Sequence, residues 1–208
     1  RSIVNQVRND ELKGVNITVP FKREIIPFLD CLDNIAKKTQ SVNTLCKVKN
    51  KVWGYNTDVE GFKNSLTWND NDFKNKNFLI LGAGGVTPSI LYSLILTANK
   101  IFITNRTKEK AKELEKRDLT GKIEVIDWGQ KPKVCDLVVN TTSIGLKKNE
   151  KLNLNFKDYE NNKDVLFYDI IYNPKETNFL KEARLRGNKT MNGKKMFLYQ
   201  ARAAFKMW

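Results

Sequence analysis

The chain has 208 residues, with 37 Lys and Arg against 23 Asp and Glu, a formal net charge of +14 and 40% hydrophobic positions. Because a domain takes roughly 100–200 residues, this length suits one large domain or two small ones. Gly, Pro and Cys are few and apolar residues are plentiful, which excludes a collagen-like chain, a disulfide scaffold and a disordered chain.

Histidine is absent from the sequence. This excludes an imidazole base, a Ser-His or Cys-His pair and a His-ligated metal, and leaves proton transfer to Lys, Asp, Glu, Tyr or Cys. Cys31, Cys46 and Cys135 share no CxxC spacing, so we expect no disulfide framework and no metal site. No apolar run approaches the roughly 20 residues that span a bilayer, and no signal-type segment opens the chain. We therefore expect reduced thiols in a cytoplasmic protein.

The positive charge is spread along the chain, mostly as single lysines or pairs such as Lys37-Lys38 and Lys194-Lys195. A nucleic-acid surface would need clustered Lys and Arg. We therefore expect a diffuse, solvated charge and no nucleic-acid partner, although the same field would help anionic small molecules to arrive.

The first part of the chain predicts a small α/β unit. Its expected elements are a strand at 15–19, a helix at 23–38, a hairpin of 42–48 and 52–55, and a helix that begins near Thr57-Asp58. The polar stretch 69–76 is rich in turn formers and predicts a linker.

After the linker, short β-branched runs alternate with amphipathic stretches, which is typical of βαβ units and a parallel sheet. The expected strands are 78–81, 100–104, 123–126, 136–140 and 165–169, with helices at 87–97 and 107–116. Further helices are expected at 177–186, followed by Gly187 at the C′ position, and at 194–208. The pattern predicts an α/β protein of two lobes, the second Rossmann-like, with ligands at the strand C-termini facing a cleft.

A glycine-rich turn lies between the first strand and helix of the Rossmann-like part. In a G-x-G-x-x-G turn of this context, backbone N–H groups and a helix N-terminus bind pyrophosphate. The match is imperfect, because Thr87 stands at the third glycine position, and a tight structural turn is the alternative. The residues expected to bind a dinucleotide here are Gly82, Ala83, Gly84, Gly85 and Val86.

The second strand of the Rossmann-like part leads into Asn105-Arg106-Thr107, where an NAD enzyme usually carries Asp or Glu. A guanidinium can form two charge-assisted hydrogen bonds to a ribose 2′-phosphate, which a carboxylate would repel. The sequence therefore indicates NADP(H). The alternative is that these residues only cap the next helix, with Thr107 as the N-cap.

Six motifs occur in a characteristic order along nearly the whole chain. They are GVNITVPFK at 14–22, VNT at 42–44, GYNTDVEGF at 54–62, NTTSIG at 140–145, DIIYNP at 169–174, and GKKM at 193–196 followed by Gln200, Phe205 and Trp208. Together they resemble the fingerprints of the shikimate dehydrogenase family. The resemblance implies an NADP-dependent oxidoreductase that reduces 3-dehydroshikimate to shikimate in aromatic biosynthesis.

The resemblance also implies the domain organisation. Residues 1–68 would form the substrate-binding lobe, 69–175 the Rossmann-like NADP-binding domain, and 176–208 the last helices, which would return to the first lobe. A reduction of this kind needs a proton donor at the carbonyl oxygen. By correspondence with the P-x-K and N-T-D motifs, Lys22 and Asp58 would be the catalytic pair, with the carboxylate orienting the amine.

Further site residues follow from the same correspondence. Thr18, Asn43, Tyr172 and Gln200 would bind the substrate, where uncharged hydrogen-bonding groups suit a polyol. Arg106 and Lys110 would lie at the adenosine end of the cofactor. Thr142, Ser143, Gly193 and Met196 would lie at the nicotinamide end.

The sequence departs from the family pattern at its start, because nothing before Lys22 matches the S-x-S pair that holds the substrate carboxylate, and Ser2 is the only serine there. We therefore expect these residues to be the middle and most of the C-terminal part of a longer protein. Two other functions stay open: a quinate or shikimate paralogue that uses NAD, and a catalytically silent nucleotide-binding or nucleic-acid-binding protein. The expected partners are small molecules, with the protein a monomer or homodimer.

Overall fold

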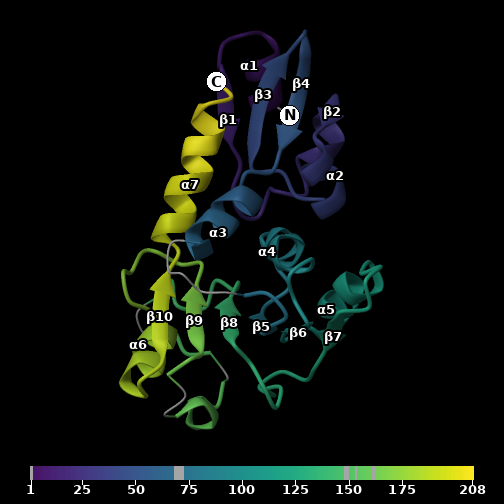
Figure 1. Ribbon diagram of the computed structural model, residues 1–208. Coiled ribbons are helices and arrows are strands. Elements are labelled where there is room, and N and C mark those ends of the chain that lie inside the picture. Colours follow the sequence, from purple (N-terminus) through teal and green to yellow (C-terminus); the bar gives the residue numbers. More distant parts are fainter. Residues whose placement is uncertain (1, 68–72, 148–149, 153, 161–162) are drawn as a thin grey trace.

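The structure is a computed structural model that describes all residues except 1, 68–72, 148–149, 153 and 161–162. Two α/β lobes lie one above the other in Figure 1, as the alternating pattern predicts. The boundary expected between residues 68 and 69, and residues 69–72 of the expected linker, lie outside the described residues.

The upper lobe is built on a four-stranded sheet of order β1-β3-β4-β2. β3 pairs antiparallel with both β1 and β4, whereas β2 runs parallel to β4. Val4, Leu45 and Val52 lie in its core. In chain order its elements are α1 (Ser2–Arg8), β1 (Gly14–Asn16), the 3-10 helix η1 (Ile26–Phe28), β2 (Cys31–Leu32), α2 (Asn34–Thr39), β3 (Thr44–Val48), β4 (Lys51–Tyr55) and α3 (Asp58–Thr67).

The helix predicted at 23–38 is wrong. Only a 3-10 turn, the short strand β2 and the helix α2 form there. Pro27 lacks an N–H and its ring clashes with a helical carbonyl, so it is tolerated in the first turn of η1 but would interrupt a long helix. α2 has its own start, because the Asp33 side chain accepts a hydrogen bond from Ala36 N at 2.7 Å.

The lower lobe contains a six-stranded sheet of order β10-β9-β8-β5-β6-β7, in which all neighbouring strands are parallel. The five predicted strands are confirmed to within one residue at their ends, and β10 was not predicted. The elements are β5 (Asn77–Leu81), α4 (Thr87–Leu94), β6 (Lys100–Thr104), α5 (Lys108–Lys116), β7 (Ile123–Val125), β8 (Leu137–Asn140), η2 (Phe156–Tyr159), β9 (Leu166–Asp169), α6 (Asn178–Leu185), β10 (Lys189–Asn192) and α7 (Lys194–Phe205).

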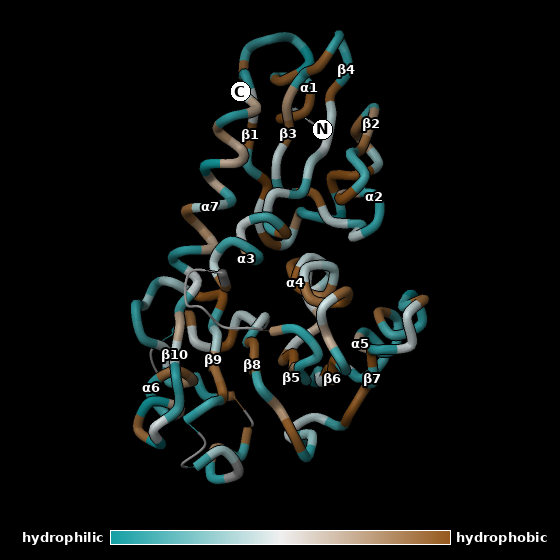
Figure 2. The backbone as a smooth tube through the Cα atoms, viewed as in Figure 1, coloured by the Kyte–Doolittle hydropathy of each residue, from teal (hydrophilic) through white to brown (hydrophobic). Residues whose placement is uncertain are grey.

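Apolar side chains cover both faces of the lower sheet, as expected for parallel strands, and the hydrophobic colour follows β8, β9 and part of α4 in Figure 2. One face packs against α4 and receives Phe62 from α3 and Met196 from α7. The other face packs against α6 and η2. Because Phe62 and Met196 come from helices that also border the upper lobe, the two lobes share part of one core.

The last two helices divide between the lobes. α7 packs along α3, and beyond its end the Trp208 indole donates a hydrogen bond to Leu45 O at 3.1 Å (Figure 1). The expected return to the first lobe is therefore confirmed for α7. It is wrong for α6, whose apolar residues Phe179, Leu180 and Ala183 are part of the core on the lower sheet.

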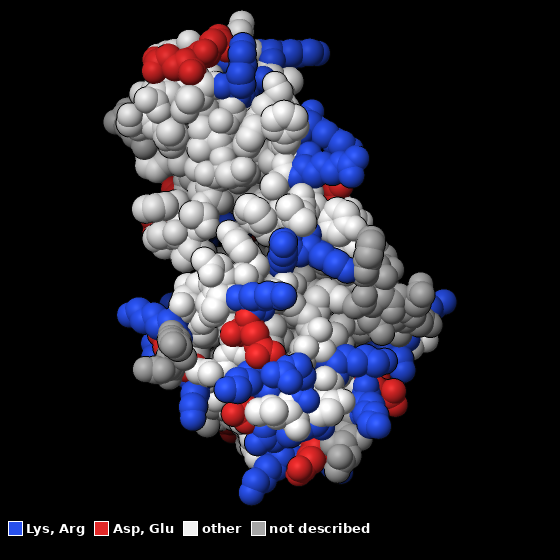
Figure 3. All heavy atoms as spheres, turned by 90° about the vertical axis from the view of Figure 1, so that its left-hand side faces the viewer, with Lys and Arg blue, Asp and Glu red and all other residues white. Residues whose placement is uncertain are grey.

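The charge is distributed as predicted on the face that Figure 3 shows, where Lys and Arg are spread over both lobes with acidic side chains among them in each. Several are neutralised locally, as in the ion pair of Arg184 Nε with Glu176 Oε1 at 2.7 Å. Within the described parts of the chain, no helix combines the length and the apolar character that crossing a membrane requires.

Candidate active site

Lys22 and Asp58 form a buried ion pair. The Lys22 Nζ atom lies 2.6 Å from Asp58 Oδ2, and the two side chains are 10% and 6% exposed. Lys22 lies in the turn before η1, where its carbonyl accepts a hydrogen bond from Val42 N, and Asp58 is the first residue of α3. The fold thus joins the two residues that the sequence predicted as the catalytic pair.

Asn43 connects this pair to α7. Its Nδ2 donates to Asp58 Oδ1 at 3.0 Å and to Gln200 Oε1 at 3.2 Å, and its Oδ1 accepts from Thr57 N at 2.8 Å. The predicted residues Asn43 and Gln200 therefore lie in the same cluster as Lys22 and Asp58. Thr57 was not predicted, although its position between Asn56 and Asp58 in the N-T-D motif was a usable signal.

Gln200 reaches the cluster because α3 and α7 cross closely at Gly61. A Cβ atom at Gly61 would lie 2.8 Å from Met196 O and 2.8 Å from the Gln200 Cβ. Only a residue without a side chain allows this approach.

Thr18 and Tyr172, the other two predicted substrate residues, lie outside this hydrogen-bonded cluster. Thr18 is exposed and follows Ile17, whose N–H donates to Asn43 O at 2.8 Å. The Tyr172 ring is also exposed and stacks on Phe197 with 4.7 Å between the ring centroids. Among the described residues, neither side chain hydrogen-bonds to Lys22 or Asp58.

The glycine turn follows β5 and begins α4, as predicted. Gly82 has φ +112°, and a Cβ there would lie 2.8 Å from Thr141 Oγ1, so a glycine is required. Thr87 stands at the third glycine position, and its buried hydroxyl hydrogen-bonds to that of Thr141 at 2.9 Å. A Cβ at Gly85 would lie 3.9 Å from the Lys22 Cβ, so the turn borders the ion pair directly.

The turn fits a pyrophosphate. Gly84 and Gly85 are exposed, and in the described part of the chain none of the N–H groups of Gly84, Gly85 and Val86 donates to a protein oxygen. The Ala83 N–H is held differently, by Asn105 Oδ1 at 3.1 Å. Free N–H groups at a helix N-terminus are the usual donors to phosphate oxygens.

Arg106, Thr107 and Lys110 lie exposed at the start of α5. Thr107 occupies the N-cap position, yet its side chain makes no capping hydrogen bond. Instead Asn105 Nδ2 donates to Thr107 O at 2.7 Å and so ties the start of α5 to the glycine turn. The Thr107 hydroxyl therefore does not cap α5, which was the alternative to a phosphate site.

The loops after β8 and β9 are joined by a buried carboxylate that the sequence did not single out. Asp169 accepts hydrogen bonds from Asn140 Nδ2 at 3.0 Å and from Thr177 Oγ1 at 2.6 Å. Burial raises the pKa of Asp169 to about 6, although the hydrogen bonds from Thr177, Ile171 N and Asn140 oppose this. Asp169 was not predicted as a site residue because its burial at the end of a parallel strand is a property of the folded structure and leaves no pattern in the sequence.

Asn140 in turn fixes the predicted nicotinamide loop. Its Oδ1 accepts from Thr142 Oγ1 at 2.7 Å and from Thr142 N at 3.0 Å, while Ser143 stays exposed. Gly193 is packed tightly, since a Cβ there would lie 2.0 Å from Ile170 O. Met196 is 6% exposed within the shared core.

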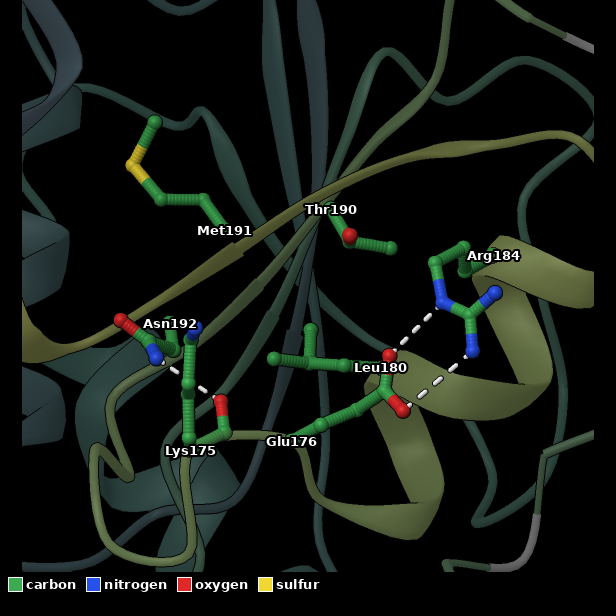
Figure 4. A pocket seen from close by; sticks show the side chains of 7 residues that line it. All are labelled: Lys175, Glu176, Leu180, Arg184, Thr190, Met191 and Asn192. Atoms are coloured by element: carbon green, nitrogen blue, oxygen red, sulfur yellow. Dashed lines mark hydrogen bonds and ion pairs between the residues drawn. The ribbon is translucent and has the colours of Figure 1, made fainter.

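A hollow of the described surface lies away from these residues. It has a volume of about 450 Å³ and lies between α6, β10 and residues 175–176 (Figure 4). An ion pair of Arg184 with Glu176 closes one side of it. No predicted site residue lines this hollow, and its open, mixed-charge wall does not match a dinucleotide site. Its lining residues are Lys175, Glu176, Leu180, Arg184, Thr190, Met191 and Asn192.

Within the described residues, no group of three or more acidic or Cys side chains could hold a metal.

Comparisons with known proteins agree along the whole chain. The family model described as shikimate dehydrogenase substrate binding domain matches residues 1–45, and the model described as shikimate / quinate 5-dehydrogenase matches residues 66–180. The chain is 50% identical over 207 residues to a shikimate dehydrogenase (NADP(+)) of Pelagibacter ubique, covering 99% of this chain and 76% of that protein.

Solved structures give the same result. A shikimate dehydrogenase from Aquifex aeolicus is 40% identical, with a TM-score of 0.90 over 100% of this chain and 76% of that one. Another, in complex with NADP+, is 32% identical, with a TM-score of 0.92 over 100% of this chain and 74% of that one.

Proposed function

The chain belongs to the shikimate dehydrogenase family, and on that premise we propose that Lys22 and Asp58 are the proton-transfer pair of its reaction. The protein is an NADP-dependent oxidoreductase that acts on a CH–OH group and interconverts 3-dehydroshikimate and shikimate. The single observation that carries the residue assignment is the ion pair of Lys22 with Asp58 at 2.6 Å, buried beside the glycine turn.

NADPH, when bound, supplies the hydride for the carbonyl carbon. The Lys22 ammonium donates a hydrogen bond to the carbonyl oxygen and gives it a proton as negative charge builds there; in the reverse direction the neutral amine accepts that proton. Asp58 holds the lysine in place through Oδ2. Its other oxygen, Oδ1, is held by Asn43, so the carboxylate has little freedom to turn away.

Asn43 and Gln200 suit recognition of the substrate hydroxyls. Their amides already approach each other at 3.2 Å next to Asp58. Gln200 Nε2 makes no hydrogen bond among the described residues and is available to a substrate hydroxyl, whereas the Asn43 amide is already fully bonded and would exchange one of its present partners for the substrate. Thr18, which follows the Ile17 N–H bonded to Asn43 O, and the exposed Tyr172 ring complete the proposed substrate set.

The cofactor residues divide into three groups. We assign the pyrophosphate to the turn of Gly82, Ala83, Gly84, Gly85 and Val86; the N–H groups of Gly84, Gly85 and Val86, which donate to no protein oxygen among the described residues, support this. We assign the adenosine 2′-phosphate to Asn105, Arg106, Thr107 and Lys110, where the exposed side chains of Arg106 and Lys110 offer positive charge. We assign the nicotinamide to the loop of Thr142 and Ser143 and to the start of α7, with Gly193 and Met196.

The alternatives are less well supported. Arg106 argues against a paralogue that uses NAD, and the Pelagibacter ubique relative is named as an NADP(+) enzyme. The division into 1–68, 69–175 and 176–208 stays a proposal; the two separate sheets support the boundary between the lobes, whereas β10 of the last segment belongs to the six-stranded sheet. The monomeric or homodimeric state, the absence of a nucleic-acid partner and the cytoplasmic location stay predictions.

The direct test is the absorbance of NADPH formed from shikimate and NADP+, with quinate and NAD+ as the competing pair. We expect the highest kcat/KM with shikimate and NADP+. A higher value with quinate or with NAD+ would contradict this substrate and cofactor preference and favour the paralogue that uses NAD.

A further inference from the structure

Asn56 makes hydrogen bonds in both lobes, although none of the motifs assigned it a role. It lies between β4 and α3 and is buried. Its Nδ2 donates to Ser89 Oγ of α4 at 2.8 Å and to Ser41 O at 2.9 Å. Its Oδ1 accepts from the backbone N–H of Asp58 at 3.1 Å. One amide therefore connects the cofactor-side helix α4 to the catalytic carboxylate.

A second hydrogen bond crosses between the lobes at the same place. Ser41 Oγ donates to Gly85 O at 2.9 Å, within the glycine turn itself. The next residue, Val42, donates its N–H to Lys22 O at 2.8 Å. We call Ser41, Asn56, Gly85 and Ser89 the inter-lobe junction.

Each side of the junction leads to one member of the catalytic pair. Ser41 leads through Val42 to Lys22, and Asn56 leads to Asp58. The side chains of Ser41, Asn56 and Ser89 are 1%, 4% and 0% exposed, so water does not readily replace these hydrogen bonds. A displacement of the glycine turn must therefore move the pair or break buried hydrogen bonds.

We infer that the inter-lobe junction couples dinucleotide binding at the glycine turn to the positioning of Lys22 and Asp58. Pyrophosphate oxygens bound to the N–H groups of the turn fix Gly85 and the first turn of α4, and the junction passes this restraint to the pair. Asn56 and Ser89 are positioning residues, since neither is proposed to touch substrate or cofactor. The inference rests on the proposed function, because it requires the glycine turn to bind the cofactor.

The chain offers a matched pair of variants for the test. Ser89→Ala removes the hydroxyl that accepts from Asn56. Ser93→Ala removes a buried hydroxyl one turn later in α4, which donates to Ser89 O at 2.7 Å and to Val59 O of α3 at 3.3 Å but not to Asn56, so it separates the Asn56 contact from other contacts between α4 and α3. Each variant deletes one buried hydroxyl from the same helix, so a general loss of stability affects both, and the melting temperature of each checks this.

The measurement is amide hydrogen exchange by NMR at Asp58, with and without saturating NADPH, after NADPH binding to each variant has been established by fluorescence. We expect NADPH to slow this exchange in the wild type and in Ser93→Ala. In Ser89→Ala the slowing should be smaller by roughly 3- to 10-fold, the range that coupling changes of about 1 kcal/mol produce. By reciprocity, shikimate should improve NADPH affinity in the wild type more than in Ser89→Ala.

The outcomes separate this inference from the proposed function. Failure of the wild type to bind NADPH would contradict the proposed function, and the coupling with it. NADPH binding with no change at Asp58, or with equal changes in Ser89→Ala and the wild type, would overturn the coupling alone. Equal losses in both variants would also overturn it, because they would show that the helix as a whole, and not the Asn56 contact, transmits the effect.

Discussion

The Lys22 ammonium and the Asp58 carboxylate are both buried, so each is the main reason why the other can stay charged away from water. Asn43 adds a neutral donor to the same carboxylate. Asp58 is thus still hydrogen-bonded when the lysine is removed. This makes substitution of Lys22 a cleaner test of chemistry than substitution of Asp58, which would leave a buried ammonium without its counter-ion.

Replacing Lys22 by methionine should lower kcat by about 10²–10⁴-fold and change the substrate affinity much less. The ammonium matters most when charge develops on the reacting oxygen, and a positioned acid typically contributes this factor. Steady-state kinetics measure both parameters. Lys37→Met, an exposed position in α2, is the control and should leave them unchanged. A near-normal kcat in Lys22→Met would refute the assignment.

Replacing Arg106 by alanine should raise the KM for NADP+ strongly and leave the use of NAD+ nearly unchanged. Only a contact to the 2′-phosphate is removed, since the exposed side chain has no other partner among the described residues. Arg117, exposed at the opposite end of α5, provides the control variant Arg117→Ala. Equal losses with both cofactors would mean that Arg106 has a structural role.

Asp169 predicts a pH dependence of stability. Burial raises its pKa from 3.8 to about 6, so between these values the folded protein keeps a proton that the unfolded chain has lost. The free energy of unfolding should therefore fall as the pH rises from about 4 to about 6, by about 3 kcal/mol from this group. Urea unfolding across this range measures the slope.

Asp169→Asn isolates that contribution. The amide oxygen can still accept from Asn140 and Ile171 N, and its NH₂ group can donate to the Thr177 hydroxyl, so the network is preserved without a titrating group. The difference in stability between variant and wild type should change across this pH window, and above about pH 6.5 the variant should be at least as stable. A constant difference from pH 4 to 7 would show that Asp169 does not titrate there.

At the scale of elements, the strands of the lower sheet could be predicted because each is a short, nearly continuous apolar run. β6, for example, begins and ends at the predicted residues. β10 was missed because its sequence, Lys-Thr-Met-Asn, is that of a partly exposed edge strand and carries no such signal. The upper lobe was harder, since β2 has only two residues and depends on its pairing with β4.

The predictable part of the site was the part that carries recognisable motifs. Lys22, Asn43, Asp58 and Gln200 come together as the resemblance implied. The hydrogen bonds of Asn56 could not be predicted, because they depend on how α4 of one lobe meets a loop of the other. Such contacts between distant segments leave no periodic pattern in the sequence.

The crossing of α3 and α7 gives a prediction for Gly61→Ala. Alanine is favoured over glycine in a helix by about 1 kcal/mol. Here, however, the new Cβ would meet the backbone oxygen of Met196 at 2.8 Å, and a backbone atom cannot rotate away. Overpacking costs about 1–3 kcal/mol, so we expect a net loss of stability.

Thermal unfolding should show a Tm lower by roughly 3–6 °C for a loss of 1–2 kcal/mol in a chain of this size. The substrate KM should rise as well, since moving α7 takes Gln200 away from Asn43. Glu60→Ala, at an exposed neighbouring position of α3, gains helix propensity but loses an acidic side chain in the first turn, so the two small effects offset and the Tm should change little. An unchanged or higher Tm for Gly61→Ala would mean that the two helices are free to separate.

At the scale of the whole molecule, the candidate site lies where the lobes meet, and side-chain contacts join the lobes in addition to the chain connections. Phe62 of α3 packs edge-on against Tyr168 of β9 with 5.1 Å between the ring centroids, and Ser65 Oγ hydrogen-bonds to the Tyr168 hydroxyl at 2.9 Å.

A long-range electrostatic field also acts on this site, since the chain carries a formal charge of +14. Both the substrate carboxylate and the cofactor phosphates are anionic, so the sign of the field favours their approach.

The last prediction is therefore that NADPH associates more slowly as salt is added. Between about 0.02 M and 0.3 M salt the Debye length shrinks from roughly 20 Å to about 6 Å, which screens charges away from the site while leaving close contacts less affected. The association rate measured by stopped-flow fluorescence should fall by roughly tenfold, and the dissociation rate should change little. Arg106→Ala is the control, because it removes a proposed close contact and should raise the dissociation rate while the salt dependence of association stays nearly the same. If salt instead raises the dissociation rate and leaves association unchanged, the attraction comes from contacts at the site and the charge of the whole molecule has no part in it.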